Sequence, residues 1–217
     1  QSTMHLDDPT RLELEYTRTM MLFLLFNAAP RVILMIGLGG GSLPKFCHHH
    51  LPDADITVVE INPAVIALRE LFQVPPDSAR FRVLEDDGAR HVRATGVRYD
   101  VILVDGFHAE GQPEALGTQD FYDACRAILQ PEGVLVVNLD SAVSEPLIAR
   151  LEHAFDGGVQ SMLPDGGTNR IALATAAPGR LREARCHARR RLQALSPALR
   201  ATLNQRAGAS GGWPVLG

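Results

Sequence analysis

Short apolar runs alternate with helical stretches along most of this chain. Five runs have the length of a buried strand, and each is bounded by turn residues. We predict strands at residues 31–36, 56–60, 81–84, 100–104 and 133–138. Strands that alternate with helices at this spacing indicate βαβ units, and therefore an α/β fold in which helices cover both faces of a parallel sheet.

Cap and turn residues mark the helices between these strands. Pro63 occupies the favoured first position of one helix, and Thr118 is a good N-cap for another. We predict helices at residues 43–51, 64–72, 88–95, 119–129 and 145–155. Two further strands, 159–163 and 169–175, flank Asp165 and predict an antiparallel hairpin that closes the sheet.

The last part of the chain carries a helical stripe of apolar residues. Its members are Leu181, Ala184, Ala188, Leu192 and Leu195. We expect this stripe to pack on the body, with a homodimer contact as the alternative. The predicted organisation is an N-terminal strand and helix segment at 1–28, a nucleoside-binding catalytic domain at 29–176, C-terminal helices at 177–207 and a loose tail at 208–217.

Bulk properties describe a globular chain of one domain. With 217 residues it is too short for two domains of ordinary size. No apolar run approaches the roughly 20 residues of a membrane span, so we expect a cytoplasmic protein that does not bind membranes. The three cysteines form no CxxC pair, which argues against disulfides and a thiolate metal site.

Charge is divided unevenly along the chain. Residues 180–217 carry +7 and residues 1–179 carry −11, which together give the net charge of −4. An acidic body favours a cationic substrate such as a polyamine, although the same excess is common on surfaces kept soluble by charge. The arginine-rich end lacks interleaved aromatic residues, so we do not expect a nucleic-acid partner.

Candidate binding residues follow three consecutive strands. The glycine turn GLGGGS at 37–42 lets the backbone approach a ligand. Glu60 lies 23 residues after Gly37, where a carboxylate accepts hydrogen bonds from both hydroxyls of a ribose. Asp87 can accept from an adenine amino group. The alternatives are a turn used for packing for the glycines, a solvated strand-end charge for Glu60 and a loop cap for Asp87.

In order and spacing, these blocks resemble the signatures of the spermidine synthase family. The matching blocks are IGLGGGS at 36–42, VEINP at 59–63, DG at 87–88 and YDVILVD at 99–105, and Tyr16 is similar to a substrate-side tyrosine. The resemblance implies a seven-stranded Rossmann-like sheet of the class I methyltransferase fold. It also implies decarboxylated S-adenosylmethionine as the aminopropyl donor, a putrescine-like polyamine as the acceptor and no metal.

The resemblance assigns a role to each matching position. It implies that the donor nucleoside contacts Gly37, Leu38, Gly39, Gly40, Gly41, Glu60, Ile61, Asp87 and Gly88. Asp105 is implied to orient or deprotonate the attacking amine. Because an aliphatic amine has a pKa near ~10, a carboxylate that accepts its proton is useful at neutral pH. The alternative for Asp105 is a loop residue that caps local backbone.

Three positions depart from the family pattern. Gly40 stands where the family usually has an aspartate that pairs with the donor's ammonium, His108 replaces a second aspartate that helps to bind the diamine, and Thr17 follows Tyr16 in place of Gln or His. Two other functions therefore stay open. One is an S-adenosylmethionine-dependent methyltransferase acting on an amine of a small molecule or protein, and the other is a nucleoside-binding homologue without activity.

Two competing kinds of site are weaker. A nicotinamide dehydrogenase can use the glycine turn and Glu60, but a short-chain reductase needs a Tyr-x-x-x-Lys pair, and Lys45 is the only lysine. The run from His48 to His50 suggests a metal, yet consecutive helical residues point about 100° apart. His108 and Glu110 lie in the loop after Asp105, where they can touch a substrate.

Overall fold

A seven-stranded sheet forms the centre of this computed structural model, which describes residues 3–108, 111–164, 168–177 and 179–204. The strand order is β3-β2-β1-β4-β5-β7-β6; β1 to β5 run parallel, and β7 is antiparallel to β5 and β6. The predicted doubly wound, mostly parallel sheet with a terminal antiparallel hairpin is confirmed. The strands are β1 (Val32–Ile36), β2 (Asp55–Glu60), β3 (Phe81–Glu85), β4 (Tyr99–Val104), β5 (Leu129–Asp140), β6 (Val159–Met162) and β7 (Asn169–Thr175).

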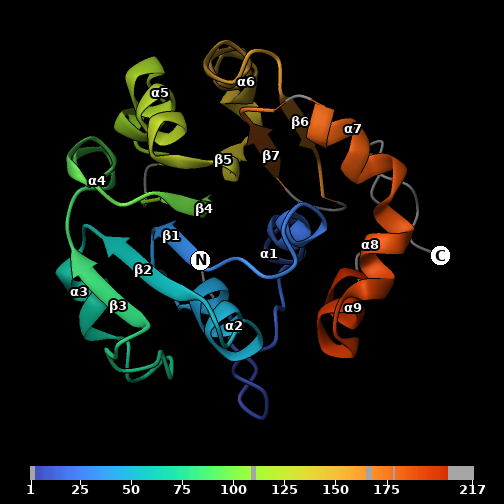
Figure 1. Ribbon diagram of the computed structural model, residues 1–217. Helices are drawn as coiled ribbons and strands as arrows, with labels where there is room; N and C mark the ends of the chain where they lie inside the picture. The colour runs from blue at the N-terminus through green and yellow to red at the C-terminus, as the bar shows by residue number, and fades with distance from the viewer. Residues whose placement is uncertain (1–2, 109–110, 165–167, 178, 205–217) are drawn as a thin grey trace.

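Helices cover both faces of the sheet (Figure 1). The helices α4, α5 and α6 form one layer, and α1, α2 and the C-terminal helices α7 to α9 lie against the other face. The helices are α1 (Glu15–Met20), α2 (Ser42–His50), α3 (Pro63–Ala67), α4 (Gly88–Ala94), α5 (Gln119–Ile128), α6 (Ser144–Ala154), α7 (Gly179–Cys186), α8 (Ala188–Ala194) and α9 (Pro197–Asn204). Three short 3-10 helices are η1 (Met21–Leu25), η2 (Glu114–Gly117) and η3 (Ser141–Val143).

The central strands are buried on both sides, which explains their continuous apolar runs. On β4, Val101 and Leu103 join the core beneath α1 and α2, whereas Ile102 and Val104 join the core beneath α4 to α6. Side chains on a strand point alternately to its two faces, so both faces of this strand must be apolar. Phe121 and Tyr122 are fully buried in the second core.

The predicted helix at 64–72 is longer than the helix that forms. Helix α3 ends at Ala67, and turns take the place of a helix over the following residues. The helix contains no buried residue. Gln73 has a positive φ of 54°, which turns the chain away from a helical path. The predicted caps are confirmed, since Thr118 accepts from Phe121 N and Pro63 begins α3.

The closing hairpin matches the prediction, whereas the N-terminal segment matches it only in its helix. Residues 3–28 contain α1 and η1 but no strand, so the expected strand is absent from the described part of this segment. Strands β6 and β7 pair as predicted, from Met162↔Ile171 to Val159↔Ala174. The turn at Asp165, the loop residue Glu110 and the tail at 208–217 lie outside the described residues.

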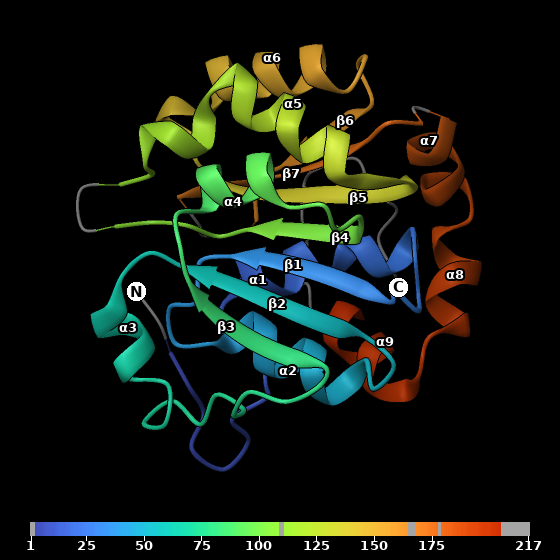
Figure 2. The same ribbon diagram turned by 60° about the vertical axis from the view of Figure 1, so that its left-hand side comes forward.

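The C-terminal helices pack on the body, as expected from their apolar stripe. Ala184, Ala188, Leu192 and Leu195 are buried in the core that α1 and η1 also enter, and Leu181 packs against it. In Figure 2 the arrowheads of β1 to β4 point to the left, and α7 and α8 lie at the right. The C-terminal helices therefore leave the carboxyl edge of the parallel strands open.

Candidate active site

The glycine turn after β1 lies between the ends of β2 and β4. Gly37 donates from its backbone N to Val59 O at 2.8 Å, and its φ is +98°. A Cβ at this position would lie 2.3 Å from the carbonyl oxygen of Asp105. Only glycine permits both this conformation and this approach. The turn is therefore built so that three strand ends meet.

The rest of the turn leads directly into α2. Gly39 and Gly41 also have positive φ, and a Cβ on Gly41 would lie 2.4 Å from the Val74 side chain. Gly41 donates from N to Leu38 O at 2.8 Å, which closes the turn. Gly40, the position that departs from the family pattern, lies in the same turn.

Glu60, at the end of β2, is joined to the glycine turn. It is 9% exposed, and its two carboxylate oxygens accept from Leu38 N at 2.8 Å and from Asn62 N at 2.9 Å. A carboxylate has about four lone-pair positions, so each oxygen keeps one acceptor position after these bonds. Ile61 follows with 64% of its surface exposed, available for an apolar ligand face.

Asp87 begins α4 beside Glu60. Its Oδ1 accepts from Arg90 N at 2.8 Å, so Asp87 is a cap, but it caps helix α4 and not only a loop. Asp86 pairs with Arg90 and with His91, and its backbone N donates to Glu60 O at 3.1 Å. The ends of β2 and β3 thus lie side by side, and Asp87 caps α4.

The carboxylate of Asp105, just after β4, lies in a small cluster of side chains. Tyr16 Oη on α1 donates to its Oδ2 at 3.2 Å, and Asn138 Nδ2 on β5 donates to its Oδ1 at 2.8 Å. The backbone N of Asp105 donates to Ile36 O at 2.8 Å, next to the glycine turn. The structure therefore brings together Tyr16 and Asp105, which the resemblance paired on the substrate side.

Burial governs the protonation of this cluster. Loss of water around the carboxylate raises the pKa of Asp105, while the hydrogen bonds from Asn138 and Tyr16 lower it. Burial, the charge of Asp105 and the hydrogen bond to it all raise the pKa of Tyr16. Asp105 is therefore a stronger base than an exposed aspartate, and Tyr16 stays a neutral donor.

Asn138 is the site residue that the sequence analysis missed. It is 2% exposed and ends an apolar run on β5, next to the strand that carries Asp105. A polar residue at the carboxyl end of a buried strand is the signal that marked Glu60 and Asp105, and the same reasoning applied to β5 would have found it.

The histidines lie apart from this cluster or at its border. His108 is exposed in the loop after Asp105 and forms a bridge with Gly111. His48 packs edge-on against Phe81, and the His50 ring lies 4.5 Å from that of Phe46. Among the described residues, no group of three or more His, Cys, Asp or Glu side chains is arranged to hold a metal ion.

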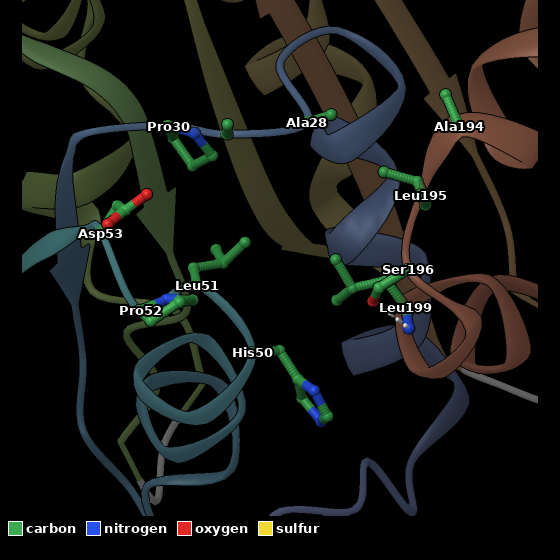
Figure 3. A pocket seen from close by; sticks show the side chains of 11 residues that line it. Ala28, Pro30, His50, Leu51, Pro52, Asp53, Ala194, Leu195, Ser196 and Leu199 are labelled. Carbon is green, nitrogen blue, oxygen red and sulfur yellow. Dashed lines mark hydrogen bonds between the residues drawn. The ribbon is translucent and has the colours of Figure 1, made fainter.

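A hollow of about 220 Å³ lies at the other edge of the sheet (Figure 3). Pro30 and Asp53 from the starts of β1 and β2 face Leu195 and Leu199 from the C-terminal helices across it. It is separate from the strand ends that carry Glu60 and Asp105.

In the described part of the chain, no helix combines the length and apolar character needed to cross a bilayer.

Comparison with protein families gives a match across most of the chain. The family described as spermine/spermidine synthase domain matches residues 13–154. A polyamine aminopropyltransferase of Chromobacterium violaceum is 46% identical over 162 residues, which is 73% of this chain and 62% of the relative. The chain thus spans less than two thirds of that relative's length.

Solved structures share the fold. Human methyltransferase-like protein 13, in complex with SAH, is 28% identical with a TM-score of 0.67, over 84% of this chain and 91% of that one. A spermidine synthase in complex with the transition-state analogue AdoDATO has a TM-score of 0.68 and 20% identity, over 89% and 76% of the two chains. The expected methyltransferase-type architecture is confirmed.

Proposed function

Because this chain belongs to the spermine/spermidine synthase family, we propose that it transfers an aminopropyl group from decarboxylated S-adenosylmethionine to an amine of a putrescine-like polyamine. The observation that carries the proposal is the Asp105 carboxylate, held by Tyr16 and Asn138 next to the glycine turn that Glu60 joins. A proton acceptor and a nucleoside site then share one edge of the sheet.

Donor binding is assigned to the turn and the neighbouring strand ends. The remaining acceptor positions of Glu60 take the two ribose hydroxyls, and the exposed Ile61 covers one face of the adenine. The oxygen of Asp87 that does not cap α4 accepts from the adenine amino group. The backbone of residues 37–41 and Gly88 is assigned to the nucleoside contact, because glycines at Gly37, Gly41 and Gly88 let the turn and the start of α4 pack closely against Asp105, Val74 and Ile36.

The transfer step needs a base and no general acid. The neutral amine nitrogen attacks the carbon attached to the sulfonium, a new C–N bond forms, and the C–S electron pair leaves with sulfur as a neutral thioether. The proton of the amine passes to Asp105, whose pKa is raised by burial. Tyr16, which donates to this carboxylate, and the exposed His108 are assigned to the acceptor amine.

Methyl transfer is the second candidate, favoured by Gly40. Without an acid at this position, a decarboxylated donor lacks a charge-assisted hydrogen bond worth about 1.5 to 3 kcal/mol. The methyltransferase-like protein 13 that shares the fold was solved with SAH. The same base would serve, since a methyl group is also attacked by an amine next to a sulfonium.

Calorimetry and product analysis on the purified protein distinguish these functions. We expect decarboxylated S-adenosylmethionine to bind more tightly than S-adenosylmethionine, and putrescine to gain one aminopropyl group by mass spectrometry. Asp105→Asn should abolish turnover, whereas Asp53→Asn removes an equal charge at a side chain that is 72% exposed on the other edge and should not. Tighter binding of the carboxylated donor with gain of a methyl group would favour methyl transfer, and binding without product would favour a homologue without activity.

A further inference from the structure

A chain of side-chain hydrogen bonds continues behind Asp105 into the sheet. Asn138 Nδ2 donates to Asp105 Oδ1 at 2.8 Å, and Asn138 Oδ1 accepts from Asn169 Nδ2 on β7 at 2.8 Å. Thr168 Oγ1 donates to Asn169 Oδ1 at 3.2 Å. The chain crosses from β4 over β5 to β7, so three neighbouring strands contribute to it.

The two partners of Asn138 determine which way its amide points. With the amide reversed, its oxygen would face the Asp105 carboxylate and its NH2 would face the NH2 of Asn169. Both contacts would then be repulsive. Because Asn138 is 2% exposed, water has little access to compensate. The orientation is therefore fixed from both ends.

We propose that Asn138 and Asn169 are positioning residues, which hold the Asp105 carboxylate in place for proton transfer through a relay of two amides. The inference rests on the proposed role of Asp105 as the base. Asn138 occupies one carboxylate oxygen and Tyr16 the other, so the orientation of the carboxylate plane is set from β5 and from α1. The remaining lone pairs of the Asp105 carboxylate therefore have a fixed direction before the substrate binds.

The Asp105 carboxylate is stabilised mainly by hydrogen bonds from Asn138 and Tyr16, and less by neighbouring charges. Tyr16 on α1 is the titratable group that contacts the carboxylate, and β1 presents Gly37 to its backbone. On the neighbouring elements, Glu60 is bound by backbone amides and Arg170 of β7 is paired with Glu145 at 3.1 Å. His108, on the loop that follows, is exposed.

Changing the far end of the relay tests this inference without touching Asp105. In Asn169→Asp the new carboxylate, when ionised, repels Asn138 Oδ1 and competes with Asp105 for the NH2 of Asn138. Asp105 then favours its protonated form. Asn169→Leu removes a partner but leaves Asp105 to hold the NH2, so the orientation survives. Asn27→Asp is the charge control, because Asn27 Oδ1 accepts from Ala29 N and a carboxylate keeps that role.

Two readouts separate positioning from simple structural support. Loss of a hydrogen bond to a charged group should move the acid limb of the kcat–pH profile upward by about one pH unit in Asn169→Asp. Asn169→Leu should move it much less, and Asn27→Asp not at all. Asn138→Ala removes the donor itself and should give the shift of Asn169→Asp without a new buried charge. If the acid limb of the kcat–pH profile lay at the wild-type pH in all four variants, the relay would be overturned.

The second readout is the unfolding free energy as a function of pH, which needs no substrate. The difference in unfolding free energy between wild type and Asn138→Ala, a variant that adds no titratable group, should change through the titration of Asp105, and that change should vanish in an Asp105→Asn background. This shift without aminopropyl transfer would support the relay and overturn the proposed function. Transfer without any shift in either readout would overturn the relay alone.

Discussion

Replacing Glu60 by glutamine tests the proposed nucleoside site most directly. The wild-type carboxylate already accepts from Leu38 N and Asn62 N, so truncation to alanine would leave two buried backbone donors without an acceptor. Glutamine keeps the size of the side chain and one acceptor oxygen. It loses the charge and turns the second oxygen into an NH2 group, which cannot accept from a ribose hydroxyl.

The hydrogen bonds of Glu60 set two expected losses in Glu60→Gln, one in nucleoside affinity and one in the free energy of unfolding. A hydrogen bond to a charged acceptor contributes about 1.5 to 3 kcal/mol, so binding should weaken about ten- to a hundredfold. The backbone N–H that faces the new NH2 group loses its acceptor, which should lower the free energy of unfolding by about 1 to 3 kcal/mol. The two losses are separable because the second is present without ligand.

Calorimetric titration with 5′-methylthioadenosine measures the first loss, and urea unfolding measures the second. Glu85→Gln is the matched control, because Glu85 is exposed and pairs in register with Glu60 on the neighbouring strand. We expect the affinity of the control to equal that of the wild type. Wild-type affinity in a folded Glu60→Gln protein would refute the assignment of Glu60 to the ribose.

Three further predictions concern the same edge of the sheet. Gly37→Ala should lower the free energy of unfolding by at least about 2 kcal/mol, because the new Cβ meets the Asp105 carbonyl at positive φ; an unchanged urea midpoint would contradict this. Asp87→Ala should lose about 1 kcal/mol of cap stability as well as nucleoside affinity, whereas Asp87→Asn keeps the cap, so calorimetry and urea unfolding separate the two roles. Burial raises the folded-state pKa of Asp105, so its favourable contribution is complete below about pH 4 and is lost as pH rises through the folded pKa. Asp105→Asn should therefore gain stability relative to wild type over that range in a pH series of unfolding curves, and parallel curves would rule out the raised pKa.

Most of the sheet could be predicted from the sequence because its central strands are buried on both faces. Residues such as Val101 to Val104 form an unbroken apolar run, and a glycine or a cap residue follows each of the first five strands. The helix at 64–72 was predicted too long because its composition gave no sign that it would lack a buried face. Burial depends on tertiary packing, which local propensity does not contain.

The site could be predicted only where its residues mark strand ends. Glu60, Asp87 and Asp105 follow apolar runs and were found individually, but the cap function of Asp87 and the backbone bonds of Glu60 required coordinates. Tyr16 came from family resemblance alone, since 89 residues separate it from Asp105. Asn138 also marks a strand end, but its contact with Asp105 depends on which strand lies next to β4.

The packing of α1 has a consequence for synthesis on the ribosome. Helix α1 contacts β5, β7 and α9, and Arg180 donates to Phe26 O across 154 residues of sequence. These partners leave the ribosome long after α1, so the apolar residues of η1, all buried in the finished fold, stay uncovered during translation and are a target for chaperones. The packing of α1 is therefore complete only after α9, which ends at Asn204, has left the ribosome.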